Sequence, residues 1–508
     1  MSNGAIEKSA KNILLSFLSQ TITMAFSLIV PRLFITVFGS EVNGFFSTVT
    51  QLYSYLEILR AGVGMAAIQA LYGPIVQKDE SQISKIISTS KKYFNKLGFV
   101  YLGATAILAI GFMLFGNVNL NKYDVLLIVI MQGVAGWLSF AQINWFVDLL
   151  RAEGKNYIFV AIQMTGIILT RIAEIILIYK TQNPVLVKSA SLFFIFLEYI
   201  AFVIYRKKYY NRFNFNDETN MSLLKNRKSY LTFHISSLIC TNTDIVILTL
   251  FCGYQISSVY SVYFLIVSGV NAIINTVYSS TAFLLGHSYQ RGIDVFRKTH
   301  DTYYLVYLTL TTALFSVCYV LMIPFIELYT LDVQDVNYIY KYLPLLFCVI
   351  QILTCGKNVG DITINVGGLA KKVVWRAILE ATINLVVSLV MVRFAGIYGV
   401  LIGTIIALSY RMIDILIFSN RNVLRRSPTK NLFMLITNLL LFLLIVIINR
   451  RFTFIIVSYW QFFKYALIIS PIILILFFAV EFLLFRTESK LIIKLSQKKL
   501  NRNQEPFY

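Results

Sequence analysis

Charged residues stand in pairs, three or four positions apart, within stretches that are otherwise apolar. The pairs are Glu57/Arg60, Arg171/Glu174, Lys357/Asp361, Arg376/Glu380 and Arg411/Asp414. This spacing places both side chains of a pair on one face of an α-helix. Two chemistries suit such pairs. The charges can neutralise each other and hold helices together, or an arginine, which stays ionised, can offer its planar fork to phosphate oxygens.

Other reactive residues show no catalytic or metal-binding spacing. His234 stands alone, ten residues before Asp244, and such a histidine is typical of a packed residue rather than a proton relay. Asp332 and Asp335 share a short connector and match a two-carboxylate enzyme site only weakly. No phosphate-binding loop of a nucleotide hydrolase occurs. The cysteines suit apolar packing and predict no metal site: they are Cys240, Cys252, Cys318, Cys348 and Cys355.

The elements that must position these residues are long apolar stretches. We expect about fourteen, near 12–38, 42–72, 93–115, 123–150, 156–179, 184–205, 229–251, 257–286, 302–329, 337–366, 372–393, 397–419, 431–449 and 462–486. A helix crosses a bilayer with roughly 20 apolar residues and satisfies its own backbone there. The chain is 57% hydrophobic. The sequence therefore predicts an all-α integral membrane protein with about 14 transmembrane helices and no separate soluble catalytic domain.

The net charge of +21 is unevenly distributed. If the N-terminus is inside, the even-numbered loops face the cytoplasm, and these inner segments hold most of the 45 Lys and Arg residues. That asymmetry is typical of multi-pass proteins with positively charged inner loops. We therefore expect both termini in the cytoplasm of a bacterial cell and the chain in the cytoplasmic membrane. The topology explains the dispersed charges without a nucleic-acid partner.

The longest polar gap suggests an internal repeat. The basic segment 206–228 separates six spans from the next six and leaves two at the end. Short echoes support the repeat: Thr36-Val37-Phe38-Gly39 and Thr249-Leu250-Phe251-Cys252-Gly253 each join the first two spans of a half. We expect two six-helix bundles related by a pseudo-two-fold axis, in domains 1–205 and 229–420. The linker would be 206–228, and two accessory helices with a basic cytoplasmic tail would occupy 421–508.

Three segments have the pattern of amphipathic surface helices. They are 81–96, 291–301 and 491–502, and each mixes apolar residues with basic ones at helical spacing. Such helices can lie on anionic headgroups. For the first two segments, ordinary polar connectors are an equal alternative. For the third, a solvated tail is favoured.

Three passages give the chain a family resemblance. The first runs from Pro31-Arg32-Leu33 to Leu59-Arg60-Ala61-Gly62, and the second is Asn242-Thr243-Asp244-Ile245-Val246-Ile247 with Val259-Tyr260-Ser261-Val262-Tyr263. The third is Glu380-Ala381-Thr382-Ile383-Asn384 with Gly396-Ile397-Tyr398-Gly399-Val400 and the residues that follow. Together with span count and loop order, they resemble the multidrug/oligosaccharidyl-lipid/polysaccharide (MOP) exporter superfamily. Within it, the polysaccharide-transporter branch of Wzx-type flippases is the most similar.

This resemblance implies a transporter, not an enzyme, with a central cavity and alternating access. The substrate it implies is an oligosaccharide on an undecaprenyl-pyrophosphate-type lipid, moved from the cytoplasmic to the outer leaflet. In that family the first two spans of each half line the cavity. The candidate residues are Arg60, Arg32, Lys357 and Arg411 for pyrophosphate, Asp244, Glu57 and Glu174 for a coupling ion or substrate, and Asn271, Asn275, Tyr278 and Gln20 for sugar. Hydrogen bonding between helices is the competing role for the sugar candidates.

Two other functions stay open. A multidrug exporter of the same architecture would favour an acidic cavity, and acids are not scarce in the spans. A membrane polymerase or ligase of the same pathway would need a larger outer loop. The flippase needs no cofactor, and the membrane potential or a Na⁺ or H⁺ gradient would drive it. Its expected partners are the polyprenyl-pyrophosphate-linked oligosaccharide, membrane lipids, a polysaccharide polymerase and chain-length proteins.

Overall fold

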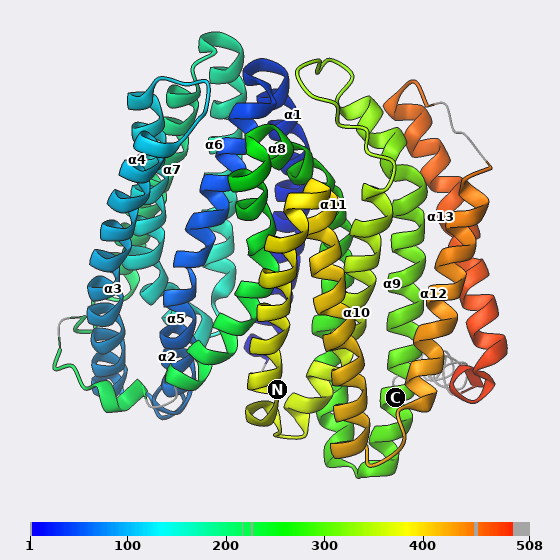
Figure 1. Cartoon of the computed structure of the whole chain (residues 1–508). Helices are drawn as coiled ribbons and strands as arrows, with labels where there is room; N and C mark the ends of the chain where they lie inside the picture. The colour runs from blue at the N-terminus through cyan, green and yellow to red at the C-terminus, as the bar shows by residue number, and fades with distance from the viewer. Residues whose placement is uncertain (1–2, 216, 225–226, 452–455, 491–508) are drawn as a thin grey trace. The chain divides into compact units, whose positions relative to one another are not determined.

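The computed structural model consists of long α-helices and describes residues 3–215, 217–224, 227–451 and 456–490 (Figure 1). Side chains are described there except at 3–10, 13, 58–62, 227–242, 279–284, 287 and 370. No β-strand occurs in these ranges, and eleven helical stretches are long and apolar enough to cross a membrane. The prediction of an all-α membrane protein is confirmed. The helices are α1 (Asn3–Leu56), α2 (Ile58–Gln77), α3 (Glu80–Phe115), α4 (Lys122–Trp137), α5 (Asn144–Ala152), α6 (Asn156–Thr181), α7 (Pro184–Tyr209), α8 (Arg227–Gln290), α9 (Ile293–Tyr329), α10 (Leu343–Val366), α11 (Val374–Asn422), α12 (Thr429–Asn449) and α13 (Tyr459–Leu484).

Three of the long helices turn back on themselves at a glycine. Gly39 in α1 has φ 83° and ψ 167°, and Gly253 in α8 has φ 86° and ψ 172°. Gly396 in α11 has φ 52° and ψ −128°. Because a side chain makes positive φ costly, glycine lets a helix reverse here without a longer loop. Gly39 and Gly253 have nearly the same backbone angles, as the sequence echo around them predicts.

Side chains on opposite arms of these hairpins touch. The rings of Phe34 and Phe46 in α1 have their centroids 5.0 Å apart. In α11, the Asn384 amide donates a hydrogen bond to the Thr404 hydroxyl at 2.8 Å. On straight helices, a rise of 1.5 Å per residue would separate these two pairs by roughly 18 and 30 Å. Each kinked helix thus supplies two apolar arms, so that eleven helical stretches hold the predicted fourteen or so crossings.

Three predicted spans are interrupted in the structure. The span at 42–72 breaks at Glu57, between α1 and α2, and the span at 123–150 contains a π-helical segment, Leu138–Ile143, between α4 and α5. The span at 337–366 becomes helical only at Leu343. The preceding backbone is held in a non-helical path by Tyr263, whose hydroxyl donates to the Tyr338 carbonyl at 2.9 Å. Apolarity alone does not reveal such a tertiary contact.

Segment 81–96 is helical, and segment 291–301 is helical from Ile293 onward, but neither is a separate surface helix. The first is the start of α3, whose N-terminus is capped by Asp79 accepting a hydrogen bond from the Gln82 backbone N–H at 2.9 Å. The second runs into α9. Protein rather than lipid covers the apolar faces, since Ile87 and Phe296 are fully buried. The predicted helix at 491–502 lies outside the described residues.

The chain divides into two compact units. One comprises Met1–Val259 with Asp332–Val336, and the other comprises Tyr260–Leu331 with Asn337–Tyr508. In the first unit, the core combines buried aliphatic side chains with aromatic rings such as Phe45, Phe94 and Trp145. In the second unit, α9 is the most enclosed helix and packs against α10, α12 and α13. Each unit therefore has its own core.

Within the first unit, the turn of α1 packs closely on the turn of α8. The backbones approach at Gly44, where an added Cβ would lie 1.8 Å from the Tyr254 carbonyl oxygen. Beside this contact, the Asn43 amide donates to the Ser258 hydroxyl at 2.7 Å. We call this set the α1–α8 tip contact. It requires a residue without a side chain at position 44.

The connector after α9 adds to the same region of the first unit. Asp335 accepts hydrogen bonds from the Ser40 backbone N–H at 2.6 Å and from its hydroxyl at 2.7 Å. Asp332 lies 3.5 Å from the Arg32 guanidinium. The two carboxylates that resemble an enzyme pair in sequence thus bind two different parts of α1.

Replacing Gly44 with alanine should destabilise the protein by about 1–3 kcal/mol, the usual cost of overpacking. The new methyl group would overlap the Tyr254 carbonyl. Thermal unfolding of the purified full chain in detergent measures the effect as a lower Tm. Gly103→Ala in α3 is the matched control, because its Cβ would meet no atom within 4 Å. A G44A protein as stable as G103A would contradict the close backbone contact.

Candidate functional site

Six of the paired charges meet within the second unit. They lie on α10 and on both arms of the α11 hairpin, and we call them the α10–α11 charge cluster: Lys357, Asp361, Arg376, Glu380, Arg411 and Asp414. The reversal at Gly396 makes the cluster possible, since it returns Arg411 to the level of Glu380. Intramembrane ionisable residues are a functional-site hypothesis by default.

Glu380 is the centre of the cluster. One of its carboxylate oxygens lies 2.5 Å from the Lys357 ammonium, and the other lies 3.4 Å from the Arg411 Nε. The Glu380 side chain is 3% exposed and that of Arg411 is 5% exposed. Both phosphate-binding candidates on these helices, Lys357 and Arg411, therefore already share one buried carboxylate.

Asp414 and Asp361 complete the charge balance. Asp414 accepts a hydrogen bond from Arg411 Nη1 at 3.1 Å and a shorter one from Arg376. Asp361 lies 3.7 Å from Arg411 Nη2. Three cations thus face three carboxylates, and the cluster is formally neutral with all its groups ionised.

The structure corrects part of the predicted pairing. Arg411 does pair with Asp414, three residues along the same helix. The spacing predicts that Arg376 pairs with Glu380, but the carboxylate partner of Arg376 is Asp414 on the opposite arm of α11. Lys357 reaches Glu380 on the neighbouring helix. Spacing along one helix predicts which residues share a face, but contacts between helices decide the partners.

In the first unit, Glu174 is buried and bound on both oxygens. Arg171, one turn earlier on α6, donates to Oε2 at 2.6 Å, and the Ser191 hydroxyl on α7 donates to Oε1 at 2.7 Å. The predicted pair Arg171/Glu174 is confirmed. Its carboxylate links α6 to α7.

The remaining charged candidates of the first unit differ in exposure. Arg32 is 31% exposed and pairs with Asp332, whose side chain is 65% exposed. Glu57 is half-buried in the turn between α1 and α2. Asp244 is buried on the first arm of α8. Arg60 lies on α2, and its side chain is outside the described residues.

Of the sugar-contact candidates, Asn271 makes the clearest contact. Its amide donates to Gln351 Oε1 on α10 at 2.6 Å, which matches the alternative of hydrogen bonding between helices. Asn275 and Gln20 are exposed, on α8 and α1. Tyr278 is half-buried, with its ring 6.2 Å from that of Tyr307. Asn271, Asn275 and Tyr278 belong to the second unit, and Gln20 belongs to the first.

Sequence reasoning missed a further charged pair, Asp148 and Arg151. Asp148 is 1% exposed on α5, and its carboxylate faces Gly64 of α2, where an added Cβ would lie 3.0 Å from Oδ2. Arg151 Nη1 lies 3.9 Å from the other oxygen. The spacing of three was a detectable signal. The π-helical segment just before α5 was not detectable, although such segments are frequent at functional sites.

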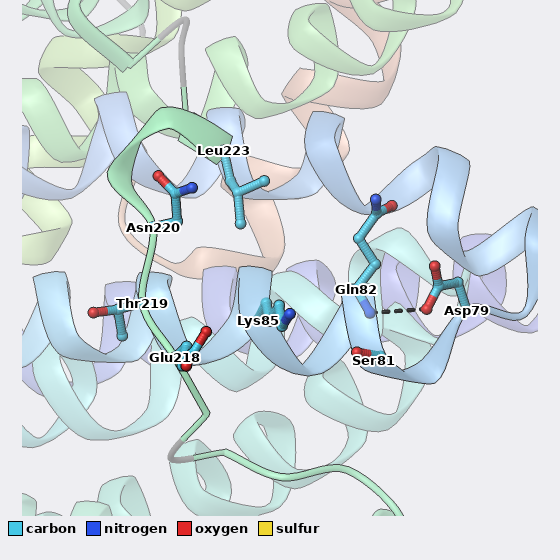
Figure 2. Close-up of a pocket in the computed structure, with 8 residues that line it drawn as sticks. All are labelled: Asp79, Ser81, Gln82, Lys85, Glu218, Thr219, Asn220 and Leu223. Carbon is cyan, nitrogen blue, oxygen red and sulfur yellow. Dashed lines mark hydrogen bonds between the residues drawn. The ribbon is translucent and has the colours of Figure 1, made fainter.

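A surface hollow of about 480 Å³ lies in the first unit, between the start of α3 and residues 218–223. Its lining side chains are drawn in Figure 2. Seven of its eight lining residues are polar, and none of the candidate residues is among them. The lining residues are Asp79, Ser81, Gln82, Lys85, Glu218, Thr219, Asn220 and Leu223. The Asp79 carboxylate is occupied by the N-terminal cap of α3.

Solved structures similar to this chain are transporters. The lipid II flippase MurJ in an inward closed conformation matches with a TM-score of 0.67 and 14% identity, over 94% of this chain and 99% of that one. A MATE-family multidrug resistance transporter of the MOP superfamily, inward-facing, matches with a TM-score of 0.63 and 14% identity, over 79% and 95%. A MOP transporter from Pyrococcus furiosus, described as having a binding pocket of reverse polarity, matches with a TM-score of 0.59 and 15% identity. The match covers 83% of this chain and 96% of that one.

No protein-family model and no curated protein matches the chain. At 14–15% identity, the likeness to solved structures defines the fold. The chain has the all-α fold of MOP-superfamily transporters, which include flippases and drug exporters.

Replacing Glu380 with glutamine should destabilise the protein by about 3–5 kcal/mol, because it strands buried positive charge beside Lys357 and Arg411. Thermal unfolding in detergent checks this. Adding Lys357→Met should recover part of the loss by restoring neutrality. Asp294→Asn is the control: its side chain is 82% exposed, and breaking a surface pair costs about 0–1 kcal/mol. Equal effects of E380Q and D294N would contradict the central role of Glu380.

Proposed function

We propose that this chain is a flippase for lipid-linked oligosaccharide repeat units, carried on an undecaprenyl-pyrophosphate-type lipid. It would move them from the cytoplasmic to the outer leaflet by alternating access, for surface polysaccharide synthesis. The three family-like passages and the MOP transporter fold support this proposal. A polysaccharide polymerase and chain-length proteins would act on the delivered units.

The extent of the fold match carries the proposal. The similarity to the lipid II flippase covers 94% of this chain, whereas the similarity to the inward-facing MATE transporter covers 79%. A MATE structure in a bent conformation covers 86% of this chain. The lipid II flippase thus resembles more of the chain than either MATE structure does, and this favours a lipid-linked substrate.

A pyrophosphate headgroup needs cations that can exchange their present partners. Arg32 suits this role, because its 3.5 Å pair with the exposed Asp332 is of a kind worth only about 0–1 kcal/mol. Lys357 and Arg411 suit it less, since breaking a buried pair costs about 3–5 kcal/mol. Arg60 remains the main phosphate candidate on sequence grounds, and Arg32 is the second.

The membrane potential is the driving force that we propose. Carrying negative charge outward from a negative interior gains about 2.3 kcal/mol per charge for each 100 mV. The α10–α11 charge cluster is neutral, and Glu174 has donors on both oxygens, so neither needs a metal cation for charge balance. Asp244 and Glu57 are the acids to test for Na⁺ or H⁺ coupling.

Replacing Arg60 with alanine should leave the protein inserted but reduce delivery of sugar units by 10- to 100-fold. A charge-assisted contact to phosphate contributes roughly 1.5–3 kcal/mol. Reconstituted vesicles with a lipid-linked oligosaccharide, probed by an outer-leaflet glycosidase, measure the flux. Arg60→Lys should recover only part of it, because the planar fork is lost. The matched control is Arg421→Ala at the exposed end of α11, and undiminished flux in R60A would remove Arg60 from the site.

A cationic dye distinguishes the flippase from a drug exporter. If the chain is a flippase, vesicles containing it should move the lipid-linked oligosaccharide and fail to accumulate or expel the dye. The same vesicles with a collapsed membrane potential should lose sugar flux, since the potential supplies the driving force. Dye transport without sugar transport would contradict the proposal.

A further inference from the structure

Two cations of the first unit meet over one buried indole ring. The ammonium of Lys91, on α3, lies 5.7 Å from the centroid of Trp145, on α5. The guanidinium of Arg206, at the end of α7, lies 5.2 Å from the same ring. Residues from three helices therefore converge on this point, which is separate from the α10–α11 charge cluster.

Arg206 sits in an aromatic setting without a carboxylate. Besides Trp145, it stacks over Phe215 of the linker at 5.6 Å, and these two rings lie 5.4 Å apart. Among the residues that the structure describes, no acid lies within ion-pair distance of Arg206. Cation–π contacts with these two rings offset only part of the cost of half-burying a guanidinium.

Lys91 adds a second positive charge close to Arg206. Its ammonium contacts the Phe215 backbone carbonyl at 3.4 Å, and it is near enough to Arg206 for the two charges to repel each other. Two positive charges this close together attract a negatively charged group more strongly than either does alone. This arrangement suits a negatively charged occupant.

The indole N–H of Trp145 supplies an independent indication of a ligand. Trp145 is 1% exposed, and its Nε1 makes no hydrogen bond to any described residue. A buried donor left without an acceptor destabilises the folded protein. Indole can only donate, so the missing partner is an acceptor atom.

We propose that Lys91, Trp145 and Arg206 form a binding site for a phosphate group. Arg206 would hold two phosphate oxygens with its planar fork, Lys91 would supply the second charge, and the Trp145 N–H would donate to an oxygen. The phosphate can come from the headgroup of an anionic lipid or from soluble phosphate, and the chemistry of recognition is the same. This site does not depend on the proposed flippase function.

Calorimetry on the full chain in detergent tests the site. The probes are inorganic phosphate, dihexanoyl phosphatidylglycerol as the anionic lipid, and dihexanoyl phosphatidylcholine as the zwitterionic comparison. We expect Arg206→Gln to weaken binding of the preferred anionic probe at least tenfold and Trp145→Phe, which keeps the ring but removes the N–H, three- to tenfold. The affinity of Arg206→Lys for this probe should lie between those of wild type and R206Q. Arg206→Lys replaces R206Q in the comparison if R206Q does not fold.

Two matched controls separate the site from a generally basic or aromatic surface. Lys208→Gln changes an exposed cation on the same helix, and Trp460→Phe changes an 81% exposed indole on α13. Both variants should bind the preferred anionic probe with a dissociation constant within twofold of that of wild type. Phosphatidylglycerol as the tighter probe would identify a lipid headgroup, and inorganic phosphate as the tighter probe would identify a soluble anion. Binding of neither probe, or equal losses in K208Q and R206Q, would overturn the proposal.

Discussion

An ionised side chain within a membrane-spanning helix needs opposite charge or strong hydrogen-bond donors within a few ångströms, and this constraint shapes both units. Glu380 is flanked by Lys357 and Arg411, and Glu174 is bound by Arg171 and Ser191. Near the start of α9, buried Asp301 accepts hydrogen bonds from Arg426 and Lys430. Each carboxylate thereby joins two elements, so the charges that are costly to bury also specify how the helices pair.

The sequence predicts the helical part of the fold because the bilayer sets simple requirements. Length and apolarity decide whether a stretch can cross the membrane, and both can be determined directly from the sequence. The turns at Gly39 and Gly253 are also indicated by a short sequence repeat around each glycine. The interruption before Leu343 is different. It depends on the Tyr263 hydroxyl, which lies far away in sequence and has no local signature.

The partners of charged residues are predictable only in part, for a geometric reason. A spacing of three or four puts Arg376 beside Glu380 on the surface of one arm, but the α11 hairpin offers Asp414 from the other arm. The amphipathic patterns at 81–96 and 291–301 have the same weakness. A helix with one apolar face has the same sequence pattern whether lipid or protein covers that face. Here protein covers it at Ile87 and Phe296.

The α10–α11 charge cluster is local in the chain, and this has a consequence for biogenesis. All six members lie between 357 and 414, and Lys357 precedes its partner Glu380 by 23 residues. During synthesis, the ammonium therefore enters the translocon before the carboxylate that it neutralises. Once the second arm of α11 has followed, the opposite charges on α10 and on the two arms of α11 can form ion pairs with one another. The nascent chain can leave the translocon with these groups already compensated, before α12 and α13 enter the membrane.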